Sequence, residues 1–268
     1  MSDAPLQDMS ALRPDPAGAC IYCGASERLS TEHILPYGLS GPATIPQASC
    51  PACARITGAV EGTVLRGAMW PLRVFRDLKS RTKHRDAPKN VSLTLVYEDG
   101  REELIDVPSA EAPIIFAFPV FAPPAIILPD GYSSDIRLRA WHTMAFGDRH
   151  IALLRRYGAT SLKATQETTP VTFARMIAKI GYAMAYADGS LARLTKRFPV
   201  VPAILGETND IGRWVGSYTD APPTYTGLLH HLIGREFNER GVFVYEVQLF
   251  ADSQTPCYTV VLGEVASE

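Results

Sequence analysis

Hydrophobic residues recur every three or four positions between residues 170 and 187, which is the spacing of one face of an α-helix. Pro170 suits the first helical turn, where its missing N–H is not needed, and Asp188 followed by Gly189 is typical of a helix end. The pattern therefore predicts one long amphipathic helix over this segment. Its apolar face consists of Phe173, Ile177, Ile180 and Met184.

Short apolar runs separated by turn residues predict β-strands on both sides of this helix. The clearest turn is the Glu-Asp-Gly-Arg sequence at residues 98–101, which is expected to join two strands of a hairpin. The predicted strands cover residues 91–97, 104–107, 114–120, 125–128, 136–141, 151–156, 228–233, 242–250 and 258–262. Successive hairpins, one main helix and a final meander favour an α+β domain with an antiparallel sheet packed against that helix.

The N-terminal quarter of the chain has a different pattern. Residues 28–35 are predicted to form a short strand pair, and a Gly/Pro-rich loop follows over residues 36–46. A helix is then expected to begin at Ser49 or Cys50 and to run toward Met69. These elements bury too little apolar surface to fold alone, so they are expected to form a small module that needs an additional source of stability.

Length and composition allow one sizeable core with such a module beside it. The chain has 268 residues, of which 46% are hydrophobic and 20% charged, as in an ordinary globular protein. The apolar segment 112–129 is interrupted by prolines and does not predict a membrane-spanning helix. The predicted division is a disordered leader over residues 1–16, the module over 17–70, a basic connector over 71–90 and an α+β domain of unassigned role over 91–268.

Four cysteines carry the strongest chemical signal. Cys20 and Cys23 form one Cys-x-x-Cys pair, and Cys50 and Cys53 form a second. Two such pairs match the ligands of a tetrahedral structural zinc ion, whose binding would stabilise the module. Cys257 stands apart and is interpreted as a buried small hydrophobe. This usage favours a metal site in a reducing cytoplasm over a disulfide framework.

The net charge of −2 conceals a basic segment. Between Val64 and Lys89, eight basic residues stand against two acids, a net charge of +6, so the rest of the chain carries −8. Such a segment suits contacts with nucleic-acid phosphates, although a solvated helix face explains the same pattern. The residues predicted to contact nucleic acid are Arg55, Arg66, Arg73, Arg76, Lys79, Arg81, Lys83 and Arg85.

A Ser-Thr-Glu-His-Ile-Leu-Pro sequence at residues 30–36 lies between the two cysteine pairs. The cysteine pairs and this Glu-His sequence together resemble the zinc-bearing branch of the HNH endonuclease family, over about residues 20–70. The resemblance implies a ββα-metal finger in which His33 is the general base that activates water and Glu32 ligates a catalytic Mg²⁺ or Mn²⁺. The cysteine-bound zinc would be a separate, structural ion.

One position departs from the family pattern. The family usually has Asn or His directly after the last cysteine as a metal ligand on the helix, whereas this chain has Ala54, whose methyl group cannot coordinate a metal. Glu61 lies on nearly the same helix face, roughly 10 Å further along the axis, and is a candidate replacement ligand. A solvent-facing helix acid is the alternative interpretation of Glu61.

Two classes of function therefore remain open. The first is a metal-dependent endonuclease that hydrolyses phosphodiester bonds in DNA, with no membrane partner. The second is a catalytically degenerate zinc module that binds nucleic acid or a protein partner. The C-terminal domain could choose the substrate, bind a partner or form a homo-oligomer. His230 and His231 lie on an apolar run, which favours a core or surface role over a metal role.

Overall fold

The computed structural model describes residues 12–79, 89–129, 132–164, 169–217, 224–237 and 240–266. All strand pairs in these segments are antiparallel, and several helices accompany them, so the predicted α+β class is confirmed. Most of the predicted leader lies outside the described residues. Leu12, the first residue that the structure describes, packs against the core. None of the helices in these segments has the length and apolarity that crossing a bilayer requires.

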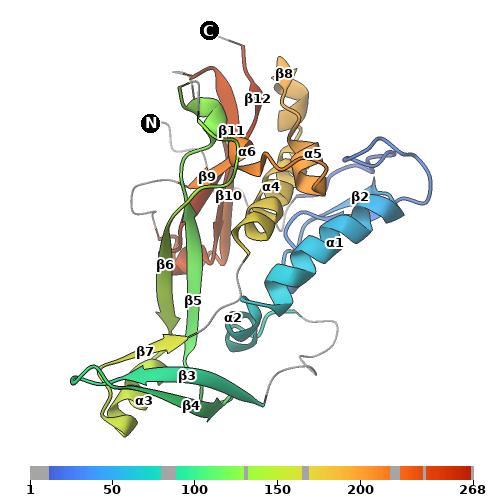
Figure 1. Ribbon diagram of the computed structural model, residues 1–268. Helices are drawn as coiled ribbons and strands as arrows, with labels where there is room; N and C mark the ends of the chain where they lie inside the picture. The colour runs from blue at the N-terminus through green and yellow to red at the C-terminus, as the bar shows by residue number, and fades with distance from the viewer. Residues whose placement is uncertain are drawn as a thin grey trace.

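Helix α4 (Pro170–Ala187) lies at the centre of the molecule, between α1 (Pro51–Arg66) and the C-terminal strands (Figure 1). Its bounds match the prediction, and the four residues of the predicted apolar face are completely buried. The helix packs unusually close to the sheet at Gly181, where an added Cβ would lie 2.8 Å from Val260 Cγ2. The predicted packing of one long helix against an antiparallel sheet is therefore confirmed.

The C-terminal sheet follows the predicted meander. Its strands are β10 (His230–Phe237), β11 (Val242–Leu249) and β12 (Cys257–Glu264), and the short strands β8 (Lys196–Arg197) and β9 (Val215–Ser217) also pair with β12. The 3₁₀ helix η3 (Ser190–Arg193) and helices α5 (Val200–Leu205) and α6 (Ile211–Trp214) connect α4 to this sheet, and the 3₁₀ helix η5 (Ala251–Ser253) follows β11. Tyr245 and Tyr258, both completely buried, hold the sheet against α4.

The middle of the chain forms a long ribbon and a lower lobe (Figure 1). The ribbon consists of β5 (Ile114–Phe121) and β6 (Leu138–Phe146), with the 3₁₀ helix η2 (Ala125–Ile127) between them. The lobe consists of β3 (Asn90–Val96), β4 (Glu102–Pro108), β7 (Ser161–Ala164) and α3 (Arg149–Tyr157). Phe116 and Phe118 of the ribbon enter the main core, whereas Leu93, Leu95 and Leu153 form a separate small core in the lobe.

The N-terminal module contains β1 (Ser30–His33), the 3₁₀ helix η1 (Tyr37–Leu39), β2 (Thr44–Ser49), α1 and α2 (Trp70–Phe75). Its buried residues, such as Ile34, Leu39 and Val60, belong to the same hydrophobic cluster as α4. The hydroxyl of Tyr182 on α4 also donates to the Ile21 carbonyl at 2.8 Å. The module is therefore docked onto α4 and shares its core.

Three local predictions were wrong. The partner of β1 is not within residues 28–35 but in β2, which begins inside the expected loop, continues to Ser49 and completes the hairpin with Ile45 and Ala48 buried. Three residues of the predicted strand 125–128 form the 3₁₀ helix η2 (Ala125–Ile127), with Pro124 at its N-cap. Residues 151–156 lie in α3, where basic residues in the last turn and Gly158, at φ +64°, are helix-ending signals.

Candidate functional site

The four predicted zinc ligands come together where the N-terminal loop meets α1. Their Sγ atoms all lie within 4.8 Å of one another, and those of Cys23 and Cys50 are 3.6 Å apart. Sulfurs placed tetrahedrally at about 2.3 Å from zinc would be about 3.8 Å apart, so the spacing fits such an ion. In the part of the chain that the structure describes, this is the one group of three or more Cys, His, Asp or Glu side chains close enough to share a metal. The cysteines can hold a metal ion such as zinc.

A turn and a helix start position these sulfurs. Gly24 adopts φ +77° and donates its N–H to the Cys20 carbonyl at 2.8 Å, which closes the first knuckle. Cys50 is the N-cap residue of α1, and Cys53 lies in its first turn. The Cys53 N–H donates to the Cys50 sulfur and lowers the pKa of Cys50 to about 7, whereas burial raises the pKa of Cys53. A bound dication would stabilise the four thiolates together.

The two candidate carboxylate ligands also converge, but on a lysine. Lys179 Nζ lies 2.7 Å from Glu32 Oε1 and 2.9 Å from Glu61 Oε1, and it donates to the His33 carbonyl. The Lys179 side chain is 1% exposed. Glu32 lies on β1, Glu61 on α1 and Lys179 on α4, so this Glu32–Lys179–Glu61 cluster ties three elements together.

The cluster does not fit the catalytic cation that the HNH resemblance implies. An ammonium group has three N–H donors, and two carboxylates and one carbonyl accept all three. Burial lowers the pKa of Lys179, but the carboxylates of Glu32 and Glu61 outweigh burial and the net shift is upward. Lys179 is therefore charged at neutral pH. A Mg²⁺ or Mn²⁺ ion bound by both carboxylates would have to lie where this ammonium lies.

A groove of about 580 Å³ opens beside the cluster, between α1 and the segment that carries β1 and η1. Ala54, Gly58 and Gly62 line it at intervals of four residues, so the small side chains of α1 leave its floor open. The half-buried His33 also lines the groove, with its ring edge-on to Tyr37 at a centroid distance of 5.8 Å. The structure thus places the predicted general base on the groove, next to the Glu32–Lys179–Glu61 cluster.

The predicted nucleic-acid contacts divide into exposed and internal residues. Arg66 and Lys79 are exposed and line the groove. Arg73 is buried, and its guanidinium donates to the carbonyls of Gly38, Leu65 and Lys79 at 2.7–3.0 Å, so it fixes the local fold. Arg73 nevertheless lines part of the groove, so its positive charge contributes to the electrostatic potential there.

Two other predicted basic contacts, Arg76 and Arg55, lie away from the groove. Arg76 forms a bidentate ion pair with Asp252, at 2.9 and 3.0 Å, that joins α2 to η5. Arg55 is exposed in a separate hollow beside Cys50. Arg81, Lys83 and Arg85 lie outside the described residues. Of the five predicted contacts that the structure describes, Arg66 and Lys79 thus combine exposure with a place on the groove.

The paired histidines near the C-terminus are both buried, at 7% and 5% exposure. His230 Nε2 donates to the Leu39 carbonyl at 2.9 Å, and its Nδ1 accepts from the Phe250 N–H at 3.3 Å. Burial lowers the pKa of His230 to about 4, so its ring is neutral and serves the core. His231 stacks on Tyr225 at a centroid distance of 4.0 Å. These contacts agree with the core role that the sequence favours.

Lys179 is the functional residue that the sequence interpretation missed. It is flanked by apolar residues on a helix that is otherwise nearly uncharged, and eleven residues of that helix are buried. A lone lysine in such a position must find a buried partner, because an unpaired buried charge is very costly. This signal predicts an ion pair, but it does not identify Glu32 and Glu61 as the partners.

The chain matches no protein-family model, and no curated protein or solved structure is significantly similar to it. The resemblance to HNH endonucleases therefore rests on the sequence motif alone.

Proposed function

We propose that this protein is a zinc-stabilised, HNH-like nucleic-acid-binding protein that does not cleave its ligand. The supporting observation is the Lys179 ammonium, which holds both carboxylates that would otherwise bind a catalytic cation. In this proposal the zinc and Lys179 keep the HNH-like scaffold in shape, and the groove beside His33 binds the phosphate backbone.

The charge around the groove supports an anionic ligand. Among the described residues, those with a charge that line or underlie the groove are Arg66, Arg73, Lys79 and Lys179 on the positive side and Glu32 and Glu61 on the negative side, a net charge of +2. Burial lowers the pKa of Arg73, and the nearby charge of Arg66 adds a smaller lowering through repulsion between the two cations. A phosphate in the groove would relieve that repulsion. Lys179 favours phosphate binding indirectly, because its charge neutralises that of one of the two carboxylates.

The rival function is the metal-dependent endonuclease that the motif predicts. The position of His33 on the groove favours it, since a general base must reach a water molecule next to the phosphate. Activity would also need a cation close to His33, and the Glu32 and Glu61 carboxylates are committed to Lys179. Cleavage and binding assays on the same preparation separate the two functions.

We expect the zinc-loaded protein to leave supercoiled plasmid and single-stranded oligonucleotides intact in Mg²⁺ or Mn²⁺. The reason is that no carboxylate pair is available to position the cation. Gel electrophoresis after prolonged incubation measures this. Nicking that disappears in His33→Ala, with zinc content and folding unchanged, would establish the endonuclease instead.

Binding to duplex DNA is expected to depend on Arg66 and Lys79. Each replacement by glutamine should weaken binding at every sequence tested and should reduce the slope of log K against log salt by about 1, because one phosphate contact is lost. Fluorescence anisotropy across a salt series measures both effects. Arg101→Gln, on the hairpin of the lower lobe, is the matched control and should leave the slope unchanged.

The groove itself can be blocked without disturbing the fold. A Cβ added at Gly58 would meet no atom within 4 Å, and leucine is a better helix former than glycine. Gly58→Leu should therefore keep or raise stability while it fills the groove and weakens duplex binding. Ala59→Leu, one position away on the exposed side of α1, is the control. Equal binding by both variants would show that the groove is not the site.

A further inference from the structure

The four cysteines of the predicted zinc site differ in exposure. Cys20, Cys50 and Cys53 are 3%, 6% and 4% exposed, whereas Cys23 is an exposed residue. Cys23 ends the first knuckle, and residues 23–28 form one continuous exposed stretch. A reagent in solution therefore reaches the Cys23 sulfur before the other three.

The exposed sulfur has a second sulfur within reach. The Sγ atoms of Cys23 and Cys50 are 3.6 Å apart. A disulfide bond is about 2 Å long, so a movement of roughly 1.5 Å would join these two atoms. Cys50 is the N-cap residue of α1, and Cys23 lies in the N-terminal loop. A disulfide between them would therefore join the same two segments that the metal joins.

A hollow of about 490 Å³ brings solvent to the second sulfur. Cys50 lines it, together with residues of the exposed stretch and of the first turns of α1. Arg28 and Arg55 also line the hollow, against one acid, Glu27. Positive charge stabilises the thiolate, which is the nucleophilic form of cysteine, and reactive cysteines are found in such partly exposed, basic surroundings.

From the exposed Cys23 sulfur, its short distance to Cys50 and the basic hollow beside them, we infer that Cys23 is an oxidation site through which a hydroperoxide releases the metal. The Cys23 thiolate attacks a peroxide oxygen, the O–O bond breaks, and hydroxide leaves, so that a sulfenic acid forms. The Cys50 thiolate then attacks the Cys23 sulfur, the S–S bond forms, and the S–O bond breaks as a second hydroxide leaves. The two thiolates lose two electrons to the peroxide, and solvent protons convert both hydroxides to water.

The disulfide removes two of the four metal ligands and leaves Cys20 and Cys53. Structural zinc sites have four protein ligands, so two thiolates should not retain the ion. The disulfide still ties the N-terminal loop to α1, so a thiol reductant and added zinc should restore the site. The inference rests on the zinc site of the proposed function, but it does not depend on nucleic-acid binding in the groove beside His33.

The test treats the zinc-loaded full chain with H₂O₂, follows zinc release with a chromogenic chelator and identifies the disulfide by peptide mass spectrometry. The bound zinc should be released, the first disulfide should join Cys23 to Cys50, and dithiothreitol with added zinc should reverse both changes. Cys23→His should keep its zinc under the same treatment, because three cysteines and one histidine also form a structural zinc site but the exposed thiol is gone. Cys257→Ala, which removes a buried thiol outside the cluster, is the matched control and should release zinc as the wild type does.

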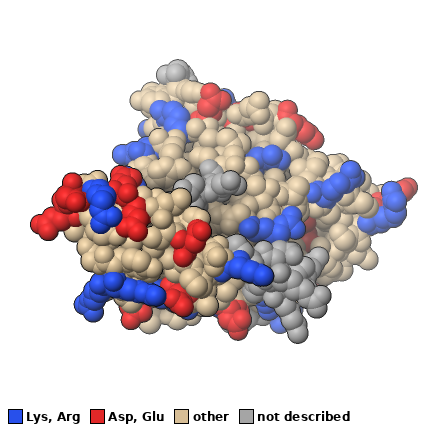
Figure 2. All heavy atoms as spheres, turned by 60° about the horizontal axis from the view of Figure 1, so that its bottom comes forward, with Lys and Arg blue, Asp and Glu red and all other residues tan. Residues whose placement is uncertain are grey.

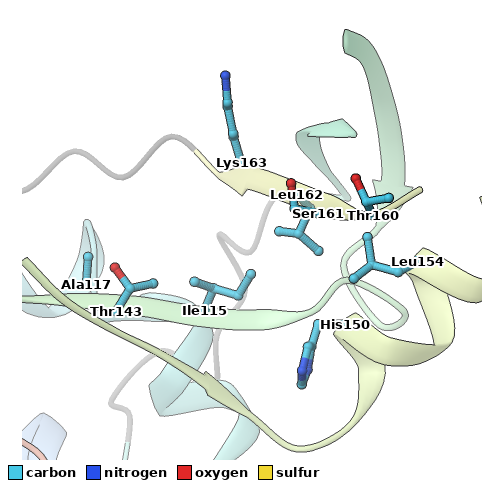
Figure 3. A pocket seen from close by; sticks show the side chains of 9 residues that line it. All are labelled: Ile115, Ala117, Thr143, His150, Leu154, Thr160, Ser161, Leu162 and Lys163. Carbon is cyan, nitrogen blue, oxygen red and sulfur yellow. The ribbon is translucent and has the colours of Figure 1, made fainter. Parts of the chain in front are cut away.

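The lower lobe is the internal control in the same molecule. Its elements β3, β4, β7 and α3 contain neither cysteine nor methionine. Figure 3 shows Ile115, Thr143 and Leu162 around the cleft of about 420 Å³ where the ribbon meets α3 and β7, and none of the side chains drawn there contains sulfur. Figure 2 shows basic and acidic side chains interspersed on the face that carries the lobe, and H₂O₂ is uncharged, so charge does not direct the oxidant. Hydrogen exchange after peroxide treatment should therefore change at α1 and stay the same in the lobe.

Each other outcome overturns the inference. If the wild type keeps its zinc in peroxide, or if its first disulfide does not include Cys23, this residue is not the oxidation site. The same holds if Cys23→His loses zinc as fast as the wild type. Should Cys23→His bind no zinc, the first disulfide of the wild type decides alone. A wild type without zinc at the start would refute both the inference and the proposed zinc site, whereas failure of the groove proposal would be seen separately, as unchanged duplex binding in Gly58→Leu.

Discussion

Replacing Lys179 with methionine is expected to lower the free energy of unfolding by about 3–5 kcal/mol, because it leaves the buried Glu32 carboxylate and the half-buried Glu61 carboxylate without their shared cation. Chemical denaturation of the purified variant measures the loss. Mn²⁺ should stabilise this variant but not the wild type, since two carboxylates and the His33 carbonyl then face a space that suits a hard cation.

Lys196→Met is the matched control. Lys196 Nζ also lies 2.9 Å from a glutamate, Glu264, but both side chains are largely exposed, at 65% and 42%. An exposed pair contributes at most about 1 kcal/mol, so the control should be close to the wild type. If both lysine variants were equally stable, or if Mn²⁺ stabilised the wild type as much as Lys179→Met, the role assigned to Lys179 would be refuted.

The second large effect is expected from loss of the metal at the cysteines. Removing zinc with a chelator, or replacing Cys50 with alanine, should unfold the N-terminal module, because structural zinc sites contribute on the order of 10 kcal/mol to folding. The loss should extend to α4, since Tyr182 and Lys179 bind the module from that helix. Circular dichroism and hydrogen exchange at α1 and α4 measure it.

Cys257→Ala provides the control for the cysteine prediction. Cys257 is also buried, but it lies on β12 and is not part of the cysteine cluster. Its replacement should reduce stability by roughly 1 kcal/mol, as point substitutions commonly do, and leave the zinc content unchanged. Retention of full zinc content and of α1 protection in Cys50→Ala would contradict the assigned ligand set.

Elements with strong local signals could be predicted from the sequence. The bounds of α4 follow from Pro170 in the first turn, a regular apolar face and Asp188 with Gly189 at the end. The C-terminal meander follows from β-rich runs separated by turns. In these segments local propensity and tertiary packing favour the same structure, so the local signal alone predicts the element correctly.

The misassigned segments are those in which local signals are weak or divided. Residues 151–156 form a short, mainly apolar segment whose length fits a strand as well as a helix. The helix is favoured by the signals at its C-terminal end, namely basic residues in the last turn followed by Gly158. The partner strand of β1 contains Pro46, which argues against a strand unless it lies at an edge. In both cases the outcome depends on packing that a single sequence does not display.

The same distinction applies to the candidate site. The cysteine cluster could be predicted because its four ligands occur in two closely spaced pairs with a recognised pattern. The Glu32–Lys179–Glu61 cluster could not, because Lys179 is 118 positions beyond Glu61 and meets it only when α4 packs against α1. Whether Glu32 and Glu61 can bind a metal cation thus depends on Lys179, which reaches them only through the tertiary structure.

Anomalous diffraction from crystals of the zinc-loaded protein soaked in Mn²⁺ tests the central claim most directly. The account predicts a zinc peak among the four cysteine sulfurs, no manganese peak between Glu32 and Glu61, and density for the Lys179 ammonium in that position. A manganese peak about 2.0–2.6 Å from oxygens of Glu32 and Glu61, with Lys179 displaced, would contradict it.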